Sequence, residues 1–236
     1  MTSLTPQVAV VTGAGRGIGA AISKRLAAMG ATVILVARDA RRLAEVQQQI
    51  ASTGGSAEAR PLDLKDDSAI SSLAQWVKER FGRCDILVNN AGIGSTGAPL
   101  HETTPGVWDD LMATNLRGPY LMIRAFAPLM IAAGAGCIVN ISSLAGHNPL
   151  KNGAAYAASK WGLNGLTYSV AEELRDHGIR VSAVATGSVN TSFGVSGKDG
   201  SWKIQPGDVA EVVAMIVSQP QQSFVSEVKM RPTRKP

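Results

Sequence analysis

Short apolar runs alternate with longer segments in which apolar residues recur at helical spacing, and this alternation extends along nearly the whole chain. Apolar runs of strand length bounded by turn residues are typical of buried parallel strands, whereas a period of about 3.6 residues is typical of an amphipathic helix. Strands that alternate with helices form repeated βαβ units. The sequence therefore predicts an α/β fold, in which helices cover both faces of a doubly wound parallel sheet.

The pattern predicts seven strands, at residues 8–11, 32–37, 57–62, 86–89, 137–141, 180–184 and 224–229. Helices are predicted at residues 18–29, 41–52, 66–81, 105–132, 155–177 and 208–218. Five of these helices are followed by a glycine, which ends helices because it adopts a left-handed conformation at little steric cost. These glycines are Gly30, Gly54, Gly82, Gly134 and Gly178.

No repeat, low-complexity tract or long linker divides the chain, and 236 residues are enough for one sizeable core. We therefore expect residues 1–236 to form a single domain. The irregular stretch 192–207 is the one substantial insertion between predicted elements, and we expect it to be a substrate lid. Residues 231–236 are expected to form a short basic tail.

The charge of the chain is concentrated at its end. Lys and Arg number 23 against 18 Asp and Glu, and Lys229, Arg231, Arg234 and Lys235 supply four of the five excess positive charges. A nucleic-acid-binding protein spreads basic residues over one face, whereas a short basic end is typical of a solvated tail. Nucleic-acid binding is therefore not expected.

Residues 1–6 lack the charged start and apolar stretch of a secretion signal, and no apolar run approaches the roughly 18 residues of a membrane helix. We expect a soluble, cytoplasmic protein with no membrane contact. Cys84 and Cys137, the only cysteines, lie near the starts of predicted strands. We interpret them as reduced core thiols without a redox role.

A glycine-rich turn joins the first predicted strand to the first predicted helix and reads Thr12-Gly13-Ala14-Gly15-Arg16-Gly17-Ile18-Gly19. Missing side chains let the backbone approach a pyrophosphate, and the N–H groups that begin a helix attract its charge. Tight packing alone would also need glycine, but strand, turn and helix follow in the order of a dinucleotide site. The residues expected to bind the cofactor here are Gly13, Gly15, Arg16, Gly17, Ile18 and Gly19.

The spacing of Gly13, Gly17 and Gly19 resembles that of the short-chain dehydrogenase/reductase family, and further family motifs follow in order. These are Asp63 after the third strand, Asn89-Asn90-Ala91-Gly92 after the fourth, Asn115 in the long helix, Ser143 after the fifth strand, and Tyr156 with Lys160. A lone Tyr-x-x-x-Lys is a common pair of surface neighbours, but ordered matches along nearly the whole chain are specific. The resemblance implies one Rossmann-like domain with a seven-stranded sheet and oxidoreductase activity.

The second strand ends in Val36-Ala37-Arg38, where an acidic side chain would bind the ribose of NAD and a basic one the extra phosphate of NADP. A guanidinium matches phosphate oxygens with paired donors, and Arg16 could add a second positive charge. The sequence therefore favours NADP(H) over NAD(H) as the cofactor. Asp39 is the opposing feature, because it could pair with Arg38 or turn inward and favour NAD.

Carbonyl reduction needs a proton donor beside the substrate oxygen while a hydride reaches the carbon. A free tyrosine, with a pKa near 10, donates well but is a poor base near neutrality. Tyr156 and Lys160 are four apart on a predicted helix and hence on one face, so we expect the lysine cation to lower the pKa of Tyr156. By resemblance, Lys160 also holds the nicotinamide ribose, Ser143 donates to the substrate oxygen, and Asn115 supports a water-linked proton path.

Ser142 competes with Ser143 for the catalytic position. Ser143 lies thirteen residues before Tyr156, which is the family's usual spacing, so we assign it the catalytic role. Ser142 is then interpreted as a strand-end hydroxyl with local hydrogen bonds.

The family resemblance also implies several further cofactor contacts. Asp63 and Leu64 would meet the adenine, Asn90, Ala91 and Gly92 would line the adenosine side, Val189 would meet the nicotinamide carboxamide, and Thr191 would bind the carboxamide or the pyrophosphate. Gly187 is expected to keep a tight turn, although Thr186 replaces the proline that usually precedes it. The C-terminal end, which lacks the glycine-rich segment of many relatives, also departs from the family pattern.

His101, His147 and His177 are neither spaced nor accompanied as a metal site, so no metal is expected. His177 is interpreted as a charge at a helix C-terminus. His147 follows Ser143 closely and could touch substrate, but we favour the interpretation that it is a polar loop residue.

The leading substrate hypothesis, again from resemblance, is a 3-oxoacyl thioester carried on acyl carrier protein. The enzymatic alternative is a small ketone, polyol, sugar or steroid. A cofactor-bound sensor without turnover is the alternative from another class, and the complete catalytic set argues against it. The resemblance further implies a homodimer or homotetramer.

Overall fold

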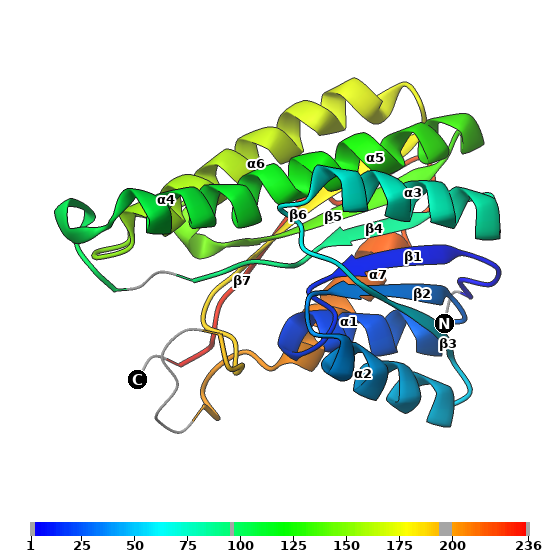
Figure 1. Cartoon of the computed structure of the whole chain (residues 1–236), viewed down its shortest axis with the longest axis horizontal. Helices are drawn as coiled ribbons and strands as arrows, with labels where there is room; N and C mark the ends of the chain where they lie inside the picture. The colour runs from blue at the N-terminus through cyan, green and yellow to red at the C-terminus, as the bar shows by residue number, and fades with distance from the viewer. Residues whose placement is uncertain (1–2, 95–96, 194–199, 235–236) are drawn as a thin grey trace.

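The computed structural model describes residues 3–94, 97–193 and 200–234, which form one seven-stranded parallel sheet flanked by helices (Figure 1). The strand order is β3-β2-β1-β4-β5-β6-β7. The strands are β1 (Val8–Thr12), β2 (Thr32–Ala37), β3 (Ser56–Pro61), β4 (Ile86–Asn89), β5 (Gly136–Ser143), β6 (Ile179–Thr186) and β7 (Glu227–Met230). The predicted Rossmann-like doubly wound sheet is confirmed.

The helices follow the predicted order along the chain. They are α1 (Gly17–Ala28), α2 (Ala40–Ser52), α3 (Asp67–Phe81), α4 (Pro105–Met112), α5 (Gly118–Ala133), α6 (Ala154–Arg175) and α7 (Pro206–Val217). Three short turns complete the elements, namely η1 (Leu100–Glu102), η2 (Ala113–Arg117) and η3 (Leu144–Gly146). No helix among these described residues is long and apolar enough to cross a membrane.

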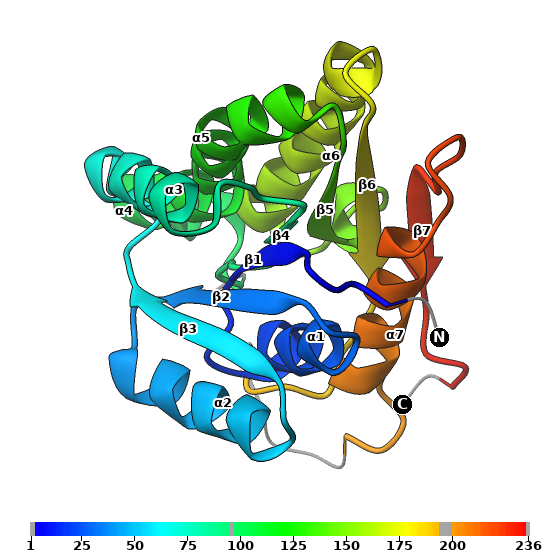
Figure 2. The same ribbon diagram turned by 90° about the vertical axis from the view of Figure 1, so that its right-hand side faces the viewer.

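Helices α1, α2 and α7 cover one face of the sheet, and α3, α5 and α6 cover the other (Figure 2). Successive side chains of a strand point to opposite faces. In β1, Ala9 and Val11 belong to the core beside α1 and α7, whereas Val8 and Val10 belong to the core beside α3 and α5. Because both faces are buried, the central strands are continuous apolar runs rather than alternating ones.

The bounds of β2 and β4 agree with the prediction, and β7 differs most, because it begins three residues later than predicted, at Glu227. All five glycines predicted to end helices have positive φ angles, between 62° and 99°. The helix predicted to start at residue 208 starts at Pro206, because Gln205 and Asp208 close a reciprocal capping box over its first turn.

The prediction of one uninterrupted helix over residues 105–132 is wrong. A π-helical turn, η2, separates α4 from α5. Pro119, the second residue of α5, has no N–H to donate to the carbonyl four residues back, which is that of Asn115. The Gly118-Pro119 pair was the sequence signal for this break, and its consequence is that Asn115 lies in the widened turn.

Both cysteines are buried at the starts of strands, as predicted. Burial raises the pKa of the Cys137 thiol to about 11 and raises the pKa of Cys84 as well. Because the thiolate is the reactive form, we expect neither thiol of the native protein to react with an aromatic disulfide reagent at pH 8, and both to react after unfolding in guanidinium chloride. Titration of released thiolate by absorbance measures this. A thiol that reacts in the native protein as fast as it does in the denaturant would contradict the assignment.

Candidate functional site

The glycine turn between β1 and α1 forms the floor of a cleft at the carboxyl end of the sheet. Gly13 has a φ of +66°, and a Cβ there would lie 2.7 Å from Asn90 Nδ2 and 2.9 Å from Ala91 Cα. Gly17 has a φ of +55°. These values exclude ordinary side chains, so the glycines bring the backbone of the turn against the loop after β4 and leave the start of α1 open to a ligand.

This close approach occurs at the point where the strand order reverses, since β2 lies beside β1 on one side and β4 lies beside it on the other. The Thr12 hydroxyl accepts hydrogen bonds from the backbone N–H groups of Asn90 and Ala91, at 3.0 and 3.1 Å. Asn90 Nδ2 also donates to the Thr12 carbonyl, at 2.9 Å. These bonds hold the two loops against each other, and both loops line a crevice of the kind that binds nucleotides in open α/β sheets.

The cleft has a volume of about 1050 Å³, which is large enough for a dinucleotide and a small substrate. It brings together nearly all the residues that the sequence predicted. Those lining it are Gly13, Gly15, Arg16, Gly17, Ile18, Arg38, Asp63, Leu64, Asn90, Ala91, Gly92, Ser143, Tyr156, Lys160, Gly187, Val189 and Thr191.

Two predicted site residues do not line the cleft. Gly19 lies behind the turn, where a Cβ would overlap the Gly13 carbonyl oxygen, so its role is close packing. Asn115 is fully buried. Its Nδ2 donates to Ile93 O at 3.0 Å and to Ser159 Oγ at 3.1 Å, and its Oδ1 accepts from Ile93 N at 2.8 Å. Asn115 therefore fixes the loop after β4 to α6.

One end of the cleft is basic. Arg38 is 70% exposed, and its guanidinium lies 4.0 Å from the Asp63 carboxylate. Asp39 also lines the cleft. Its carboxylate caps α2 by accepting from Arg42 N at 3.1 Å and lies 3.2 Å from Arg42 Nε, so Asp39 pairs with Arg42 and not with Arg38.

The sequence analysis missed several residues that line the cleft, among them Arg42, Lys65, Ser192, Phe193 and Lys203. A Cβ on Gly15 would lie 3.2 Å from the Arg42 Cβ, which places Arg42 beside the glycine turn. Its position four residues after Arg38, in the first turn of the helix that follows β2, was the available signal.

The other end of the cleft contains Ser143, Tyr156 and Lys160. The Ser143 hydroxyl is hydrogen-bonded to the Tyr156 hydroxyl. Lys160 is 5% exposed; its Nζ donates to the Ile141 carbonyl at 2.9 Å and lies 6.0 Å from the centre of the Tyr156 ring. The strand end of β5 and the first turns of α6 therefore bring a hydroxyl, a phenol and an ammonium together.

The expectation that Lys160 lowers the pKa of Tyr156 is not met by this structure. Burial raises the pKa of Tyr156, and the hydrogen bond with Ser143 opposes that rise. Lys160 is itself desolvated, and its pKa falls to about 8. The lysine cation points to the Ile141 carbonyl rather than to the phenol oxygen, and desolvation outweighs its attraction for a tyrosinate.

Ser142 also lines the cleft, but its hydroxyl is engaged by another residue of α6 than Tyr156. Its hydroxyl donates to Asn164 Oδ1 on α6 at 2.6 Å and is buried. The prediction that Ser142 makes local hydrogen bonds is therefore wrong, because its hydroxyl joins β5 to α6. The selection of Ser143 as the hydroxyl that faces Tyr156 agrees with this geometry.

The stretch predicted as a lid is shorter than expected, because residues 206 and 207 begin α7 and the buried Ile204 forms a parallel bridge with Val189. Residues 194–199 of this stretch lie outside the described residues. Before them, Ser192 Oγ accepts from Arg16 Nη1 at 3.0 Å, and the Phe193 ring lies 6.4 Å from the Tyr156 ring. The described start of the stretch thus spans both ends of the cleft.

Gly187 serves close approach rather than a left-handed turn, since it is absent from the positive-φ glycines of the described chain. Its N–H donates to the Met230 carbonyl at 2.9 Å, and a Cβ would lie 3.0 Å from Pro232 Cδ. The loop after β6 is therefore fixed to the strand β7, which takes over part of the rigidity that the missing proline would have given.

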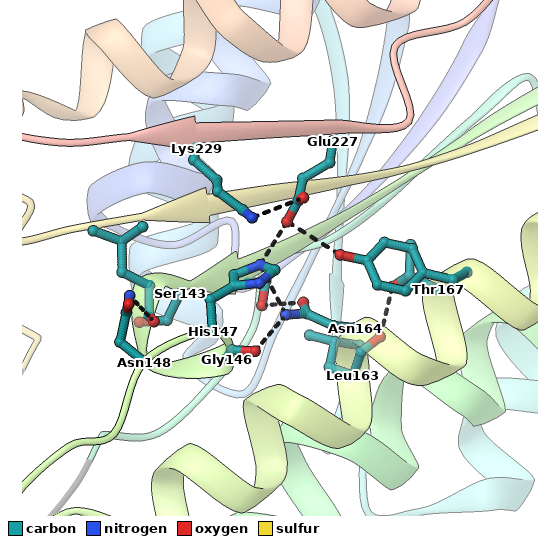
Figure 3. A network of polar contacts seen from close by, with 12 residues as sticks. Ser143, Gly146, His147, Asn148, Leu163, Asn164, Thr167, Glu227 and Lys229 are labelled. Carbon is teal, nitrogen blue, oxygen red and sulfur yellow. Dashed lines mark hydrogen bonds and ion pairs between the residues drawn. The ribbon is translucent and has the colours of Figure 1, made fainter.

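The three histidines lie apart from the cleft lining. His147 Nε2 lies 2.5 Å from Glu227 Oε1 of β7, and it also lies 3.1 Å from Asn164 Nδ2 (Figure 3). Among the described residues, no group of three or more His, Cys, Asp and Glu side chains is arranged to hold a metal ion.

Comparison with known proteins gives consistent matches. The model of a family described as short chain dehydrogenase matches residues 7–200. An uncharacterized oxidoreductase of Staphylococcus saprophyticus is 36% identical, with 98% of this chain and 100% of that protein covered. Among solved structures, a metagenomic short-chain oxidoreductase in complex with NADP is 55% identical, with a TM-score of 0.89 over 98% of this chain and 99% of that one. An alcohol dehydrogenase from the archaeon Thermococcus sibiricus, complexed with 5-hydroxy-NADP, is 29% identical with a TM-score of 0.90 over 98% of both chains.

The buried Lys160 gives a prediction that separates stability from activity. A lysine pKa lowered from 10.5 to about 8 means that burial of the cation costs about 3 kcal/mol near pH 7. Lys160→Met removes that cost, so we expect a more stable protein at pH 7 with no catalytic activity. Since the unfolded state binds the extra proton between the two pKa values, wild-type stability rises from about pH 8 to 10.5, and the gap between the two proteins should narrow there.

Urea unfolding at pH 7 and pH 9.5 measures this difference. Lys24→Met is the matched control, because it makes the same change outside the cleft. A Lys160→Met protein that is less stable than wild type at pH 7, or a gap that is the same at both pH values, would contradict the assignment of a desolvated cation.

Proposed function

This chain belongs to the short-chain dehydrogenase family, and on that premise we propose that it transfers a hydride between NADP(H) and a carbonyl or secondary alcohol. The observation that carries the proposal is the division of one continuous cleft into a basic end and an acid/base end. Arg16, Arg38 and Arg42 line the former, and Ser143, Tyr156 and Lys160 line the latter. A nicotinamide dinucleotide with an additional phosphate carries that phosphate at its adenosine end and its reactive ring at the other end, with the pyrophosphate between them.

The residues fit such a cofactor on geometric grounds. The glycine turn offers the start of α1 without obstructing side chains, and the first turn of a helix binds phosphate through its free N–H groups. Val189 and Thr191, which follow the fixed Gly187, line the same cleft, and a Cβ on Gly17 would lie 3.1 Å from Thr191 Cγ2. When bound there, the nicotinamide would supply or accept the hydride, and the protein would supply the proton.

Tyr156 is proposed as the general acid in reduction. Its raised pKa keeps the phenol protonated at neutral pH, so it can donate to the developing alkoxide. The Ser143 hydroxyl, already hydrogen-bonded to it, would donate a second hydrogen bond to the same substrate oxygen. In alcohol oxidation Tyr156 must lose its proton, and the Lys160 cation and the Ser143 hydrogen bond would stabilise the resulting anion.

NADP is proposed over NAD because the Asp39 carboxylate after β2, which lines the cleft, is already paired with a cation. Asp39 is held by α2 and Arg42, and Arg38 and Arg42 both border the cleft. The similar metagenomic oxidoreductase was solved in complex with NADP, which supports the same assignment.

Two substrate classes are proposed. A 3-oxoacyl thioester on acyl carrier protein follows from the sequence resemblance. A specific observation favours a small ketone instead, because the Phe193 ring lies against Gly94, where a Cβ would be 3.1 Å from a ring carbon, and 6.4 Å from the Tyr156 ring. This contact narrows the opening beside Tyr156 and provides an apolar wall.

We also propose a homodimer or homotetramer, in which the apolar groove bordered by Met112, Leu116, Tyr120 and Leu166 is covered by a second copy.

Tyr156→Phe tests the proposed activity. Loss of the phenol proton should lower kcat for reduction by at least about a hundredfold, because general acid catalysis contributes that much or more, while NADPH binding changes little. The measurement is NADPH depletion with a panel of small ketones and 3-oxoacyl thioesters, combined with a fluorescence titration of NADPH. Tyr168→Phe on the same helix, outside the cleft lining, is the control. Turnover by Tyr156→Phe equal to that of wild type would remove the mechanism, and NADPH binding without turnover of any panel member by wild type would favour the sensor.

Three arginine variants test the cofactor assignment. Arg38→Ser and Arg42→Ser should each weaken NADPH binding by about tenfold or more and leave NADH binding nearly unchanged, because each removes a charged hydrogen bond to the 2′-phosphate. Arg41→Ser is the matched control, since Arg41 is 83% exposed, pairs with Glu45 and does not line the cleft. Equal weakening of NADPH and NADH in either of the first two variants would exclude the phosphate contact.

A further inference from the structure

The C-terminal strand, which departs from the family pattern, meets the loop that carries Ser143. Glu227 of β7 lies with its Oε1 atom 2.5 Å from His147 Nε2 and 3.1 Å from the Tyr168 hydroxyl, and with its Oε2 atom 3.3 Å from Lys229 Nζ (Figure 3). The His147 and Glu227 side chains are 19% and 22% exposed. This partly buried contact joins an element near the C-terminus to the turn directly after β5.

The direction of the His147 hydrogen bond follows from the shorter of two contacts. Asn164 Oδ1 accepts from Ser142 at 2.6 Å and Asn164 Nδ2 donates to the Gly146 carbonyl at 3.0 Å, so the amide presents its donor Nδ2 to His147 Nε2, at 3.1 Å. The contact of the same Nε2 with the Glu227 carboxylate is much shorter, and it decides the position of the proton. An unprotonated Nε2 would place two acceptors 2.5 Å apart. His147 therefore carries a proton on Nε2 and donates it to the Glu227 carboxylate, whether the ring is neutral or charged.

His147 ends the short turn η3, and that turn begins at Ser143, whose hydroxyl accepts from Ala145 N at 3.1 Å. The same turn lies directly on the lysine of the proposed site. A Cβ on Gly146 would lie 2.9 Å from the Lys160 carbonyl oxygen and 2.6 Å from Asn164 Nδ2. The position of η3 therefore sets the separation between Ser143 and the backbone of Lys160.

The turn also contacts the loop after β6. A Cβ on Gly187 would lie 3.3 Å from Leu144 Cδ1, and the Gly187 N–H donates to Met230 at the end of β7. Strand β7 thus holds both neighbours of the proposed nicotinamide site: the Gly187 loop through its backbone, and the Ser143 turn through the Glu227 side chain.

We propose that His147 and Glu227 are positioning residues, whose hydrogen bond holds the turn η3 so that Ser143 remains hydrogen-bonded to Tyr156. The inference rests on the proposed function. Neither residue lines the cleft, so neither touches substrate or cofactor, and their effect is transmitted through Ser143. Sequence motifs identify Ser143, Tyr156 and Lys160, but the part of the chain that keeps the serine in place lies in the atypical C-terminal strand.

The consequence appears in the pKa of Tyr156. The Ser143 hydrogen bond lowers this pKa against the larger effect of burial. If η3 moves, that lowering is lost and the pKa rises. Alcohol oxidation requires ionised Tyr156, so the rising limb of its pH profile should move to higher pH. The groups around Tyr156 that bear on this limb are Ser143, Lys160 and the uncharged Phe193 ring.

Two disruptive and two conservative variants test the proposal. His147→Phe keeps a ring but removes the donor, and Glu227→Ala removes the acceptor. His147→Gln retains an amide donor, and Glu227→Gln retains an acceptor oxygen. Lys229→Gln and Tyr168→Phe are matched controls, because each removes another partner of Glu227 and leaves the His147 contact intact.

We expect the disruptive variants to lower kcat by about tenfold to a hundredfold, as misplacement of a catalytic group by a fraction of an ångström to 1 Å does, with the oxidation profile moved to higher pH and NADPH affinity unchanged. The double variant should be no slower than the slower single variant, because both remove one interaction. The conservative variants should recover most of the rate, and the two controls should equal wild type. Thermal unfolding records the folded fraction of each protein.

The proposal is overturned if His147→Phe and Glu227→Ala retain the wild-type kcat, if they lose rate only in proportion to their folded fraction with an unmoved pH profile, or if the controls lose as much as they do. These results are distinguishable from failure of the proposed function. A wild-type protein that binds NADPH but reduces no ketone refutes the latter, whereas an active wild type with unaffected variants refutes only the positioning role.

Discussion

The whole site depends on the reversal of strand order between β1 and β4. Parallel strands place their carboxyl ends at one edge of a sheet, and connections that leave a strand in opposite directions must separate there. Asn90 donates two hydrogen bonds to Thr12 and so joins the two loops at the start of the opening, and the glycines let the loop backbones approach closely. Everything that lines the cleft, from Arg38 to Tyr156, is placed relative to this opening.

The cationic side chains at the two ends of the cleft differ in their exposure to water. The arginines at one end are exposed or half-exposed and pair with Asp39 and Asp63 in contact with water, so they cost little to maintain and remain available to an anion. At the other end the single cation of Lys160 is withdrawn from water and held by one carbonyl oxygen. Such a group is destabilising for the fold. The chemistry proposed at Tyr156 would account for this cation, as is common where function and stability compete.

The sequence predicted most of the fold because its signals are local. Continuous apolar runs marked the strands, and glycines with left-handed conformations marked helix ends. Nearly all the residues selected from the glycine turn and its matching motifs line the cleft. The prediction failed where a result depends on distant contacts. The role of Arg42 depends on its approach to Gly15, the bonding of Ser142 on an amide in α6, and the direction of the Tyr156 pKa on how deeply the phenol is buried. The partner of His147 lies eighty residues along the chain, and no spacing rule connects them.

The widened turn η2 has a consequence for how this chain can change in length. A π-helical turn accommodates one more residue than an α-helical turn, and each residue of a helix advances the facing direction by about 100°. Deleting one residue from this turn would therefore convert it into a regular α-helical turn and leave the facing directions of α4 and α5 nearly unchanged. Leu121, Met122 and Phe126, which are buried against the sheet, and Leu111 would keep their buried positions. The same deletion within α5 would rotate one part of that helix by about 100° relative to the other, so the irregular turn is the place in this long helical segment where loss of one amino acid disturbs the core least.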